Sequence, residues 1–88
     1  MHISYDPDKD ASNTVKHGVS LSAAAKIEWE TAVTVKDMRA EYGENRLVTL
    51  AYIGNRLHCM VHVARGNTLR VISLRKANMR EEQRYAET

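Results

Sequence analysis

The sequence contains a single cysteine, Cys59, among its 88 residues. One thiol cannot form an intramolecular disulfide, and it excludes a zinc site that is built on several thiolates. No apolar run approaches the ~20 residues that a membrane-spanning helix requires. The first residues lack a charged segment followed by an apolar one, which a secretory signal needs. We therefore expect a cytoplasmic protein that does not associate with membranes.

Proline and glycine are also scarce, with one and four residues respectively. Hydrophobic residues make up 43% of the chain and charged residues 27%, which is typical of a globular domain and not of a disordered chain. The length suffices for one domain and is too short for two. We expect a single domain over residues 1–88 with a modest stability, because a chain of this size buries only roughly 60–65% of its unfolded surface.

The charge is nearly balanced, with a formal net charge of +2, which only mildly indicates an anionic partner. Its distribution along the chain is more informative, because the acidic residues lie towards the two ends. Five arginines occur between positions 46 and 75 without an acidic residue among them: Arg46, Arg56, Arg65, Arg70 and Arg75. The middle of the chain is therefore basic.

Local signals in the first part of the chain predict a short strand followed by a helix. Residues 2–5 are a candidate strand. Asp6 is a good N-cap, and Pro7 suits the first position of a helix. Gly18 is suited to end the helix in the left-handed conformation. These signals predict a helix over residues 7–17.

The next segment begins with a second helix signal. Ser20 can cap a helix over residues 21–29, which has apolar residues along one side. Residues 31–35 have strand propensity, and the polar stretch 36–45 is expected to be a loop.

The middle of the chain contains two Gly-Asn pairs, each between segments rich in branched apolar residues. Glycine as the first residue of a two-residue loop suits a type II′ hairpin turn. The pairs predict an antiparallel meander with strands at 46–53, 56–65 and 68–75. Asn78 and Glu81 then resemble a capping box, which predicts a C-terminal helix to about Ala86. The expected fold class is α+β.

The two short loops also predict the register. With two residues in each loop, the numbers of two opposed residues sum to 109 in the first hairpin and to 133 in the second. Opposed residues share a face of the sheet. The more apolar face, which we expect helices to cover, carries Val48, Leu50, Tyr52, Leu57, Cys59, Val61, Val63, Ile72 and Leu74. The other face is mixed and carries Leu47, Thr49, Ile53, His58, Met60, His62, Val71, Ser73 and Arg75. In this register Arg75 lies opposite His58.

The same register gathers three arginines at one end of the sheet. Arg46 lies opposite Val63, Val63 lies opposite Arg70, and Arg65 is a diagonal neighbour of Arg46. Like charges at this spacing repel, so we expect an anionic partner or nearby carboxylates to compensate them. The candidate carboxylates are Glu41 and Glu44.

Several short motifs occur in order along the chain. The first are Tyr5-Asp6-Pro7, Asn13 and Lys16-His17-Gly18-Val19-Ser20, followed by the alanines of a helix. The middle ones are Asp37-Met38-Arg39 and Tyr42-Gly43-Glu44-Asn45-Arg46. The last are Arg70-Val71-Ile72-Ser73-Leu74-Arg75-Lys76-Ala77, then Glu81 or Glu82, and Tyr85. This ordered set resembles the BrnT family of toxins over nearly the whole chain.

The resemblance implies a RelE-like fold and a ribonuclease activity. It also implies a BrnA-type antitoxin that neutralises the toxin in a hetero-oligomer. The complex is expected to bind operator DNA through the antitoxin and to repress its own operon.

RNA cleavage without a metal requires a base for the 2′-hydroxyl proton, cations for the pentavalent phosphate, and an acid for the leaving oxygen. No carboxylate cluster in the sequence indicates a bound magnesium ion, so we expect neither metal nor cofactor. Arginine suits the phosphate because its planar fork binds two oxygens, and histidine titrates near neutral pH. The predicted catalytic residues are His17, Arg46, Arg65 and Arg75. The predicted RNA-binding residues are Lys16, Arg70 and Tyr85.

Each of these residues also has a structural interpretation. The arginines could be solvated charges or salt-bridge partners, His17 could satisfy the last carbonyls of a helix, and Tyr85 could be a packing residue. We expect His58 and His62 to be packed or interface residues. Cys59 is expected to be buried and inert.

Two other functions remain open from the sequence. The chain could be an RNA- or protein-binding module without catalysis, or a degenerate toxin that acts only as a corepressor with its antitoxin. Convergence of Lys16, His17, Arg46 and Arg65 on one cleft would favour the ribonuclease.

Overall fold

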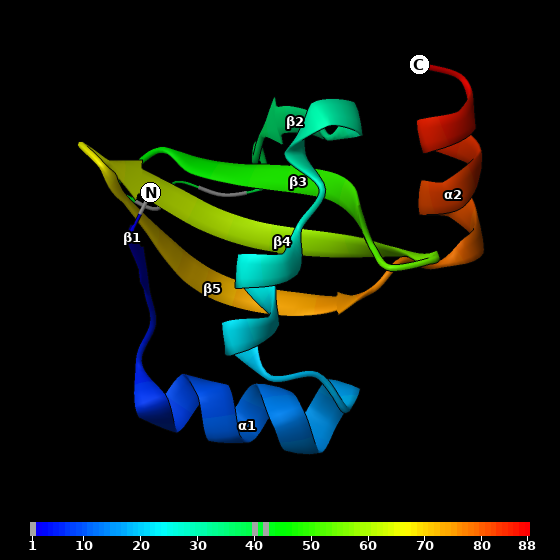
Figure 1. The fold of residues 1–88 in the computed structure, drawn as a ribbon. Coiled ribbons are helices and arrows are strands. Elements are labelled where there is room, and N and C mark those ends of the chain that lie inside the picture. Colours follow the sequence, from blue (N-terminus) through cyan, green and yellow to red (C-terminus); the bar gives the residue numbers. More distant parts are fainter. Residues whose placement is uncertain (1, 40, 42) are drawn as a thin grey trace.

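The computed structural model describes residues 2–39, 41 and 43–88 and has an α+β fold (Figure 1). Five strands form one sheet in the order β1-β5-β4-β3-β2. The strands are β1 (His2–Ser4), β2 (Val33–Lys36), β3 (Arg46–Ile53), β4 (Arg56–Arg65) and β5 (Thr68–Lys76). The helices are α1 (Pro7–His17), α2 (Met79–Ala86), and the 3-10 helices η1 (Leu21–Lys26) and η2 (Trp29–Thr31). The predicted fold class and the meander of β3, β4 and β5 are confirmed.

Two further strands extend this meander at its edges. β1 pairs with the start of β5 in parallel, and β2 pairs with β3 in an antiparallel ladder. Both hairpin turns are as predicted, with positive φ angles of 64° at Gly54 and 57° at Gly66. A type II′ turn needs this conformation at its first loop residue, which only glycine adopts without strain.

The caps of the two α-helices follow the sequence signals. Asp6 Oδ1 accepts a hydrogen bond from Asp8 N at 2.9 Å at the start of α1. At the start of α2, Asn78 Oδ1 accepts from Glu81 N, and Glu81 Oε1 accepts from Asn78 N, both at 2.9 Å. Each bond satisfies a backbone donor that the helix itself leaves unpaired.

The helix predicted over residues 21–29 is wrong in type and length. Ser20 caps it as expected, but the segment is a 3-10 helix that ends at Lys26. Ile27 is buried in an extended conformation, and Glu28 N donates to Tyr52 O at 3.0 Å. The helix stops there because this backbone bond ties the chain to the end of β3.

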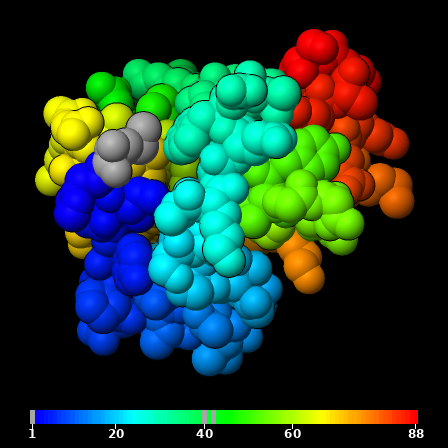
Figure 2. Space-filling view, in the orientation of Figure 1, coloured from blue at the N-terminus to red at the C-terminus, as the bar shows by residue number. Residues whose placement is uncertain are grey.

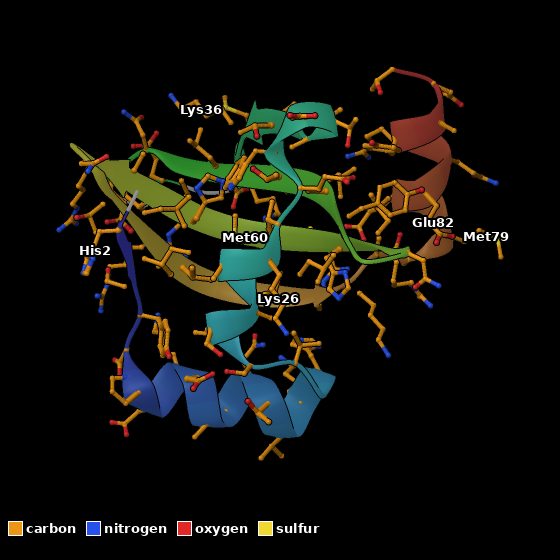
Figure 3. All side chains as sticks on the ribbon, viewed as in Figure 1. His2, Lys26, Lys36, Met60, Met79 and Glu82 are labelled. Carbon is orange, nitrogen blue, oxygen red and sulfur yellow. The ribbon has the colours of Figure 1, made fainter. Side chains whose placement is uncertain are left out.

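The main core lies between the sheet and η1, which crosses in front of the strands in Figure 1. Leu21, Ala24 and Ile27 pack there against Ala51, Met60, Leu69, Val71 and Leu74 of the sheet. Figure 3 shows Met60 beneath this segment, and its side chain is fully buried. We call this the helix-covered face. In the space-filling view of Figure 2, taken from the same side, η1 and the segment after it lie across the sheet.

The opposite face is called the groove face, and it is turned away from the viewer in Figure 1. It carries Val48 and Leu50 of β3 and Cys59 and Val61 of β4. We expected helices to cover this face because of its valines and leucines, and that expectation is wrong for α1 and η1. Of the described helices α2 is the one that packs on it, through Tyr85 on a small cluster of Leu50, Leu57, Cys59 and Ala77.

Helix α1 runs along the outer edge of β5, beyond the part that β1 covers (Figure 1). Asn13 makes this contact with a buried side chain. Its Nδ2 donates to Leu74 O at 2.7 Å, and its Oδ1 accepts from Leu74 N at 3.3 Å. The amide therefore replaces the neighbouring strand that the edge of β5 lacks at this point.

A β-bulge in β5 changes the predicted register. The first hairpin pairs as expected throughout, and the second does so from Arg65↔Thr68 to His62↔Val71. The next pair is Val61↔Ser73, so Ile72 is left without a partner on β4. An extra residue in one strand moves all later side chains to the other face.

This shift corrects three predicted placements. Leu74 lies opposite Met60 on the helix-covered face, where it is fully buried. Ser73 and Arg75 lie on the groove face. Arg75 is paired with Cys59, and its predicted position opposite His58 is wrong.

Candidate active site

The groove face is hollowed between the sheet and α2, with a volume of about 300 Å³. Val48, Cys59, Val61, Ser73 and Arg75 form its sheet side. Residues 35–39 form one wall and α2 forms the other. Its charged lining residues are four basic ones, Lys36, Arg39, Arg75 and Arg84, and two acidic ones, Asp37 and Glu81. We call this hollow the groove, and its excess of positive charge suits a polyanion.

Arg75 is fixed in the groove by a two-pronged ion pair with Glu81. Arg75 Nη1 donates to Glu81 Oε1 and Arg75 Nη2 donates to Glu81 Oε2, both at 2.8 Å. Nη1 also donates to the carbonyl oxygen of Lys76 at 3.3 Å. Glu81 thus holds the end of the guanidinium. Three of the five N–H groups of Arg75 are engaged in these hydrogen bonds.

The two remaining N–H groups of Arg75 are those of Nε and one of Nη2. They lie next to each other on the side edge of the planar guanidinium, and the described residues place no acceptor there. Two parallel donors of this kind match two oxygens of one phosphate group. Arg75 can therefore bind an anion while it remains attached to Glu81.

The pair also shifts the pKa values of both partners. Hydrogen bonds from Arg75 lower the pKa of Glu81 to about 2, against the opposing effect of burial. The carboxylate in turn raises the pKa of Arg75. Both groups are consequently charged over the whole physiological pH range, which suits a fixed electrostatic role and not proton transfer.

Arg39 forms a second ion pair at the wall of the groove. Its Nε donates to Asp37 Oδ1 at 2.8 Å and its Nη2 donates to Asp37 Oδ2 at 2.7 Å. The Asp37 side chain is 1% exposed, whereas that of Arg39 is 68% exposed. The buried carboxylate therefore orients a solvent-accessible arginine beside Arg75.

The predicted arginine cluster lies at the other end of the groove face. Val63 is paired with Arg46 on one side and with Arg70 on the other, as expected. Glu44 compensates two of the charges, since Arg46 Nε donates to its Oε1 and Arg65 Nη2 donates to its Oε2, both at 3.2 Å. On β4 the partners of Arg70 and Arg75 are Val63 and Cys59, four residues apart, so this cluster stands roughly 13 Å from Arg75.

His17 and Lys16 lie at the end of α1 and are not among the residues that line the groove. His17 follows Asn13 by four residues, so both side chains point to the same side of the helix. Since Asn13 is bonded to Leu74, this side of α1 faces the last part of β5, the strand that carries Arg75. The structure thus does not gather Lys16, His17, Arg46 and Arg65 into one described cleft.

Tyr85 has a clear structural role. Its ring stacks edge-on against Tyr52, with 5.6 Å between the ring centres, and its hydroxyl donates to Thr31 O at 2.8 Å. These contacts hold α2 against β3. A role of Tyr85 in RNA binding stays a prediction.

Three further titratable groups, all on β4, are buried: His58, Cys59 and His62. His58 and His62 are 7% and 3% exposed, and burial lowers the pKa of His62. Burial also raises the pKa of the Cys59 thiol to about 11, helped by the nearby Glu81 carboxylate. Cys59 is therefore a protonated thiol and unsuited to act as a nucleophile, as expected.

No metal site is formed within the described part of the chain, since no three His, Cys, Asp or Glu side chains there lie close enough to share an ion. None of the described helices has the length and apolar content that spanning a membrane requires.

Of the charged residues that line the groove, the sequence named only Arg75 as a site residue; the five others were missed: Lys36, Asp37, Arg39, Glu81 and Arg84. Arg39 and Glu81 were noted only as parts of motifs. The signal that could have found Glu81 is its position three residues after Asn78, which fixes the carboxylate near the end of β5.

A small α+β domain with a basic groove on one face of its sheet fits an enzyme that acts on nucleic acid. Comparison with protein families then gives a match over residues 5–81 to the model described as ribonuclease toxin, BrnT, of type II toxin-antitoxin system. The match covers most of the chain, which therefore belongs to the BrnT family. No curated protein matches the sequence.

Membership of this family makes the chain an RNA-cleaving toxin of a type II toxin-antitoxin system. Its partners accordingly include an RNA substrate and a cognate antitoxin. The resemblance seen in the sequence is confirmed, although Tyr85 lies beyond the matched residues.

Proposed function

We propose that the groove is the active site, where Arg75 binds the phosphate that is cleaved and stabilises its transition state without a metal ion. The observation that carries this proposal is the side edge of Arg75, with two adjacent N–H groups directed away from the ion pair with Glu81. A guanidinium that is already oriented stabilises developing charge without reorganising during the reaction.

In the proposed reaction the 2′-oxygen attacks the neighbouring phosphorus and the bond to the 5′-oxygen breaks. A base removes the proton of the 2′-hydroxyl, and an acid protonates the leaving oxygen. We assign His17 to the proton transfer because it ends α1 one turn after Asn13, the residue that bonds this helix to Leu74 of β5. Arg75 neutralises the charge on the two phosphate oxygens that take no part in bond making or breaking.

The arginine cluster extends the RNA-binding surface away from the reacting phosphate. Arg46, Arg65 and Arg70 share the groove face with Arg75, and Arg65 is largely exposed. A longer RNA bound at Arg75 would pass over this cluster along β4 and β5. We assign these residues to further phosphates of the RNA, together with Lys16 beside His17.

The partner and its setting follow from the family resemblance. We propose a BrnA-type antitoxin that forms a hetero-oligomer with the toxin in the cytoplasm. The complex would bind operator DNA through the antitoxin and repress its own operon.

The test is cleavage of bulk RNA by the purified protein in the presence of EDTA. Replacement of Arg75 by alanine is expected to lower the rate roughly 10²–10³-fold, the usual effect of removing one donor to a transition-state oxyanion. Arg75→Lys keeps the charge but loses the fork, so it should recover only part of the rate.

His17→Ala and Arg46→Ala belong in the same experiment, with Arg80→Ala as the matched control. Arg80 is exposed on α2 and lies outside the groove, so this variant should cleave like the parent. Loss of cleavage in EDTA would contradict the metal-independent reaction. Full activity of Arg75→Ala would remove the groove as the active site.

A further inference from the structure

A second hollow of about 290 Å³ adjoins the groove beneath α2. Four apolar side chains form its sheet side, Val33 and Val35 of β2 and Val48 and Leu50 of β3. Tyr85, Thr88 and the charged Glu81 and Arg84 close it from the C-terminal segment. We call this hollow the side pocket.

The side pocket and the groove are continuous. Four residues line both of them: Val35, Val48, Glu81 and Arg84. Glu81 also holds Arg75, so the mouth of the side pocket lies beside the proposed phosphate site. A group attached to a phosphate bound at Arg75 can therefore enter the side pocket directly.

The lining suits a flat ring with a polar edge. Valine and leucine side chains can pack against the faces of a ring, while Glu81 can accept and Arg84 can donate a hydrogen bond at the mouth. The nucleobases of RNA combine these two properties, and single-stranded RNA presents them unstacked to a protein. The volume also accommodates one base.

We propose that the side pocket binds the nucleobase adjacent to the phosphate held by Arg75. This inference rests on the proposed function, because it takes the groove to be the site of cleavage. The side pocket then contributes to the choice of RNA sequence, since the base that fits it best positions the neighbouring phosphate for reaction.

The test fills the side pocket and leaves the groove unchanged. Val33 and Thr88 line the side pocket only, so Val33→Phe and Thr88→Trp introduce bulk there without touching Arg75. Phenylalanine retains the strand propensity of position 33. Thr88 is exposed and lies outside α2, so its replacement does not threaten the fold. Val15→Phe, at a position 89% exposed on α1, is the matched control.

The probes are deoxyoligonucleotides with one ribonucleotide, which restricts cleavage to a single bond. Each of the four bases is placed at the ribose, and abasic versions lack the base on either side of the cleaved bond. Binding of the fully deoxy versions, which lack the nucleophile, gives a second measure that needs no turnover.

We expect both filling variants to lower kcat/KM or affinity about tenfold for probes with bases, a typical effect of losing one base contact. On one of the two abasic probes they should equal the parent protein, since nothing then enters the side pocket. Equal losses on all probes, or no loss on any, would overturn the inference.

Arg75→Ala separates this inference from the proposed function. Suppose that Arg75→Ala is inactive while the filling variants lose equally, or not at all, on probes with and without the base. The groove then remains the active site, and the side pocket is not a base site. If Arg75→Ala cleaves like the parent, the proposed function fails. Loss of antitoxin binding with unchanged cleavage in the filling variants would assign the side pocket to the antitoxin and overturn the inference.

Discussion

Arg75 and Glu81 join the last strand to the last helix through two hydrogen bonds of 2.8 Å each. The same carboxylate closes the capping box of α2 by accepting from Asn78 N. Glu81 therefore fixes both the start of the helix and the direction of the guanidinium. The wall of the groove and its main cation are set by one side chain.

Glu81→Gln should separate these two roles. Glutamine still fits the capping box, so α2 is expected to form, but it cannot pair as an anion with Arg75. The charge of Arg75 is then no longer neutralised by a carboxylate, and its guanidinium loses its fixed orientation. We expect kcat for RNA cleavage to fall about tenfold, an effect at the low end for electrostatic stabilisation, while KM does not rise. Steady-state kinetics on a single RNA measure both, and an increase in KM alone would contradict a positioning role.

The same substitution should alter acid stability. The pKa of Glu81 is about 2 in the folded protein and near 4.5 when unfolded, so the unfolded chain binds the proton more readily. The stabilisation is complete above about pH 4.5 and is lost as the pH falls towards 2, amounting to at most about 3 kcal/mol. Denaturant unfolding from pH 6 to pH 2 should show a flatter decline for Glu81→Gln. Glu82→Gln, exposed on the next position of α2, should keep the steep decline.

The sequence predicted the strands, turns and caps well because each depends on a few neighbouring residues. It failed at Ile72, where the strand has a bulge but no glycine. The spacing of Leu69, Val71 and Leu74 in fact changes from two to three residues, which is the pattern of a strand that bulges to keep its apolar side chains on one face. This change of spacing carries Arg75 into the groove.

The site itself was only partly predictable for a related reason. The arginine cluster follows from strand register, so its partners were found in advance, including Glu44. The groove depends on how residues 35–39 and α2 approach the sheet, and such contacts between distant segments leave no local sequence pattern. Arg75 was predicted as a site residue from its chemistry, but the face and the strand partner predicted for it were wrong.

From the burial of His62 we expect a second dependence of stability on pH, at higher pH than for Glu81. Its Nε2 shares a hydrogen bond of 2.7 Å with Thr49 Oγ1, the ring packs edge-on with Trp29, and among the described residues its buried Nδ1 has no partner. Burial lowers the pKa of His62, so the folded state favours the neutral ring. The unfolded chain takes up the proton below about pH 6.5, and stability should decrease as the pH falls through that value.

This effect can be measured as the difference in unfolding free energy between pH 7.5 and pH 5.5. His62→Gln keeps a hydrogen-bonding group for Thr49 and should show a smaller difference than the parent. His2→Gln, an exposed position, should behave like the parent. Equal pH dependence in all three proteins would mean that His62 does not titrate differently on unfolding.

From the contacts of Asn13 we expect that its replacement lowers the stability of the fold and also affects the proposed site. Its amide makes three bonds, two with Leu74 and one to Val19 O at 2.8 Å. Asn13→Ala leaves the buried N–H and C=O of Leu74 without these partners, which costs about 1–3 kcal/mol. Since Asn13 also places α1 along β5, RNA cleavage should fall if His17 acts from that helix. Ser12→Ala, exposed on the same helix, should change neither quantity, and loss of stability without loss of activity would argue against His17.

From the ion pairs of Glu44 we expect that removal of its charge increases the affinity for RNA. The carboxylate pairs with Arg46 and Arg65, so it offsets part of the charge that the arginine cluster offers to RNA. Glu44→Gln removes that negative charge and leaves a neutral group of the same size. If the cluster binds phosphates, affinity for a deoxyoligonucleotide should increase several-fold at low salt. The dependence on salt concentration should also become steeper, because more counterions are displaced.

Arg65→Ala should change both quantities in the opposite direction. Glu82→Gln, which removes a carboxylate of α2, controls for the change in net charge. Equal affinities of the parent and Glu44→Gln at every salt concentration would place the path of the RNA away from Arg46 and Arg65.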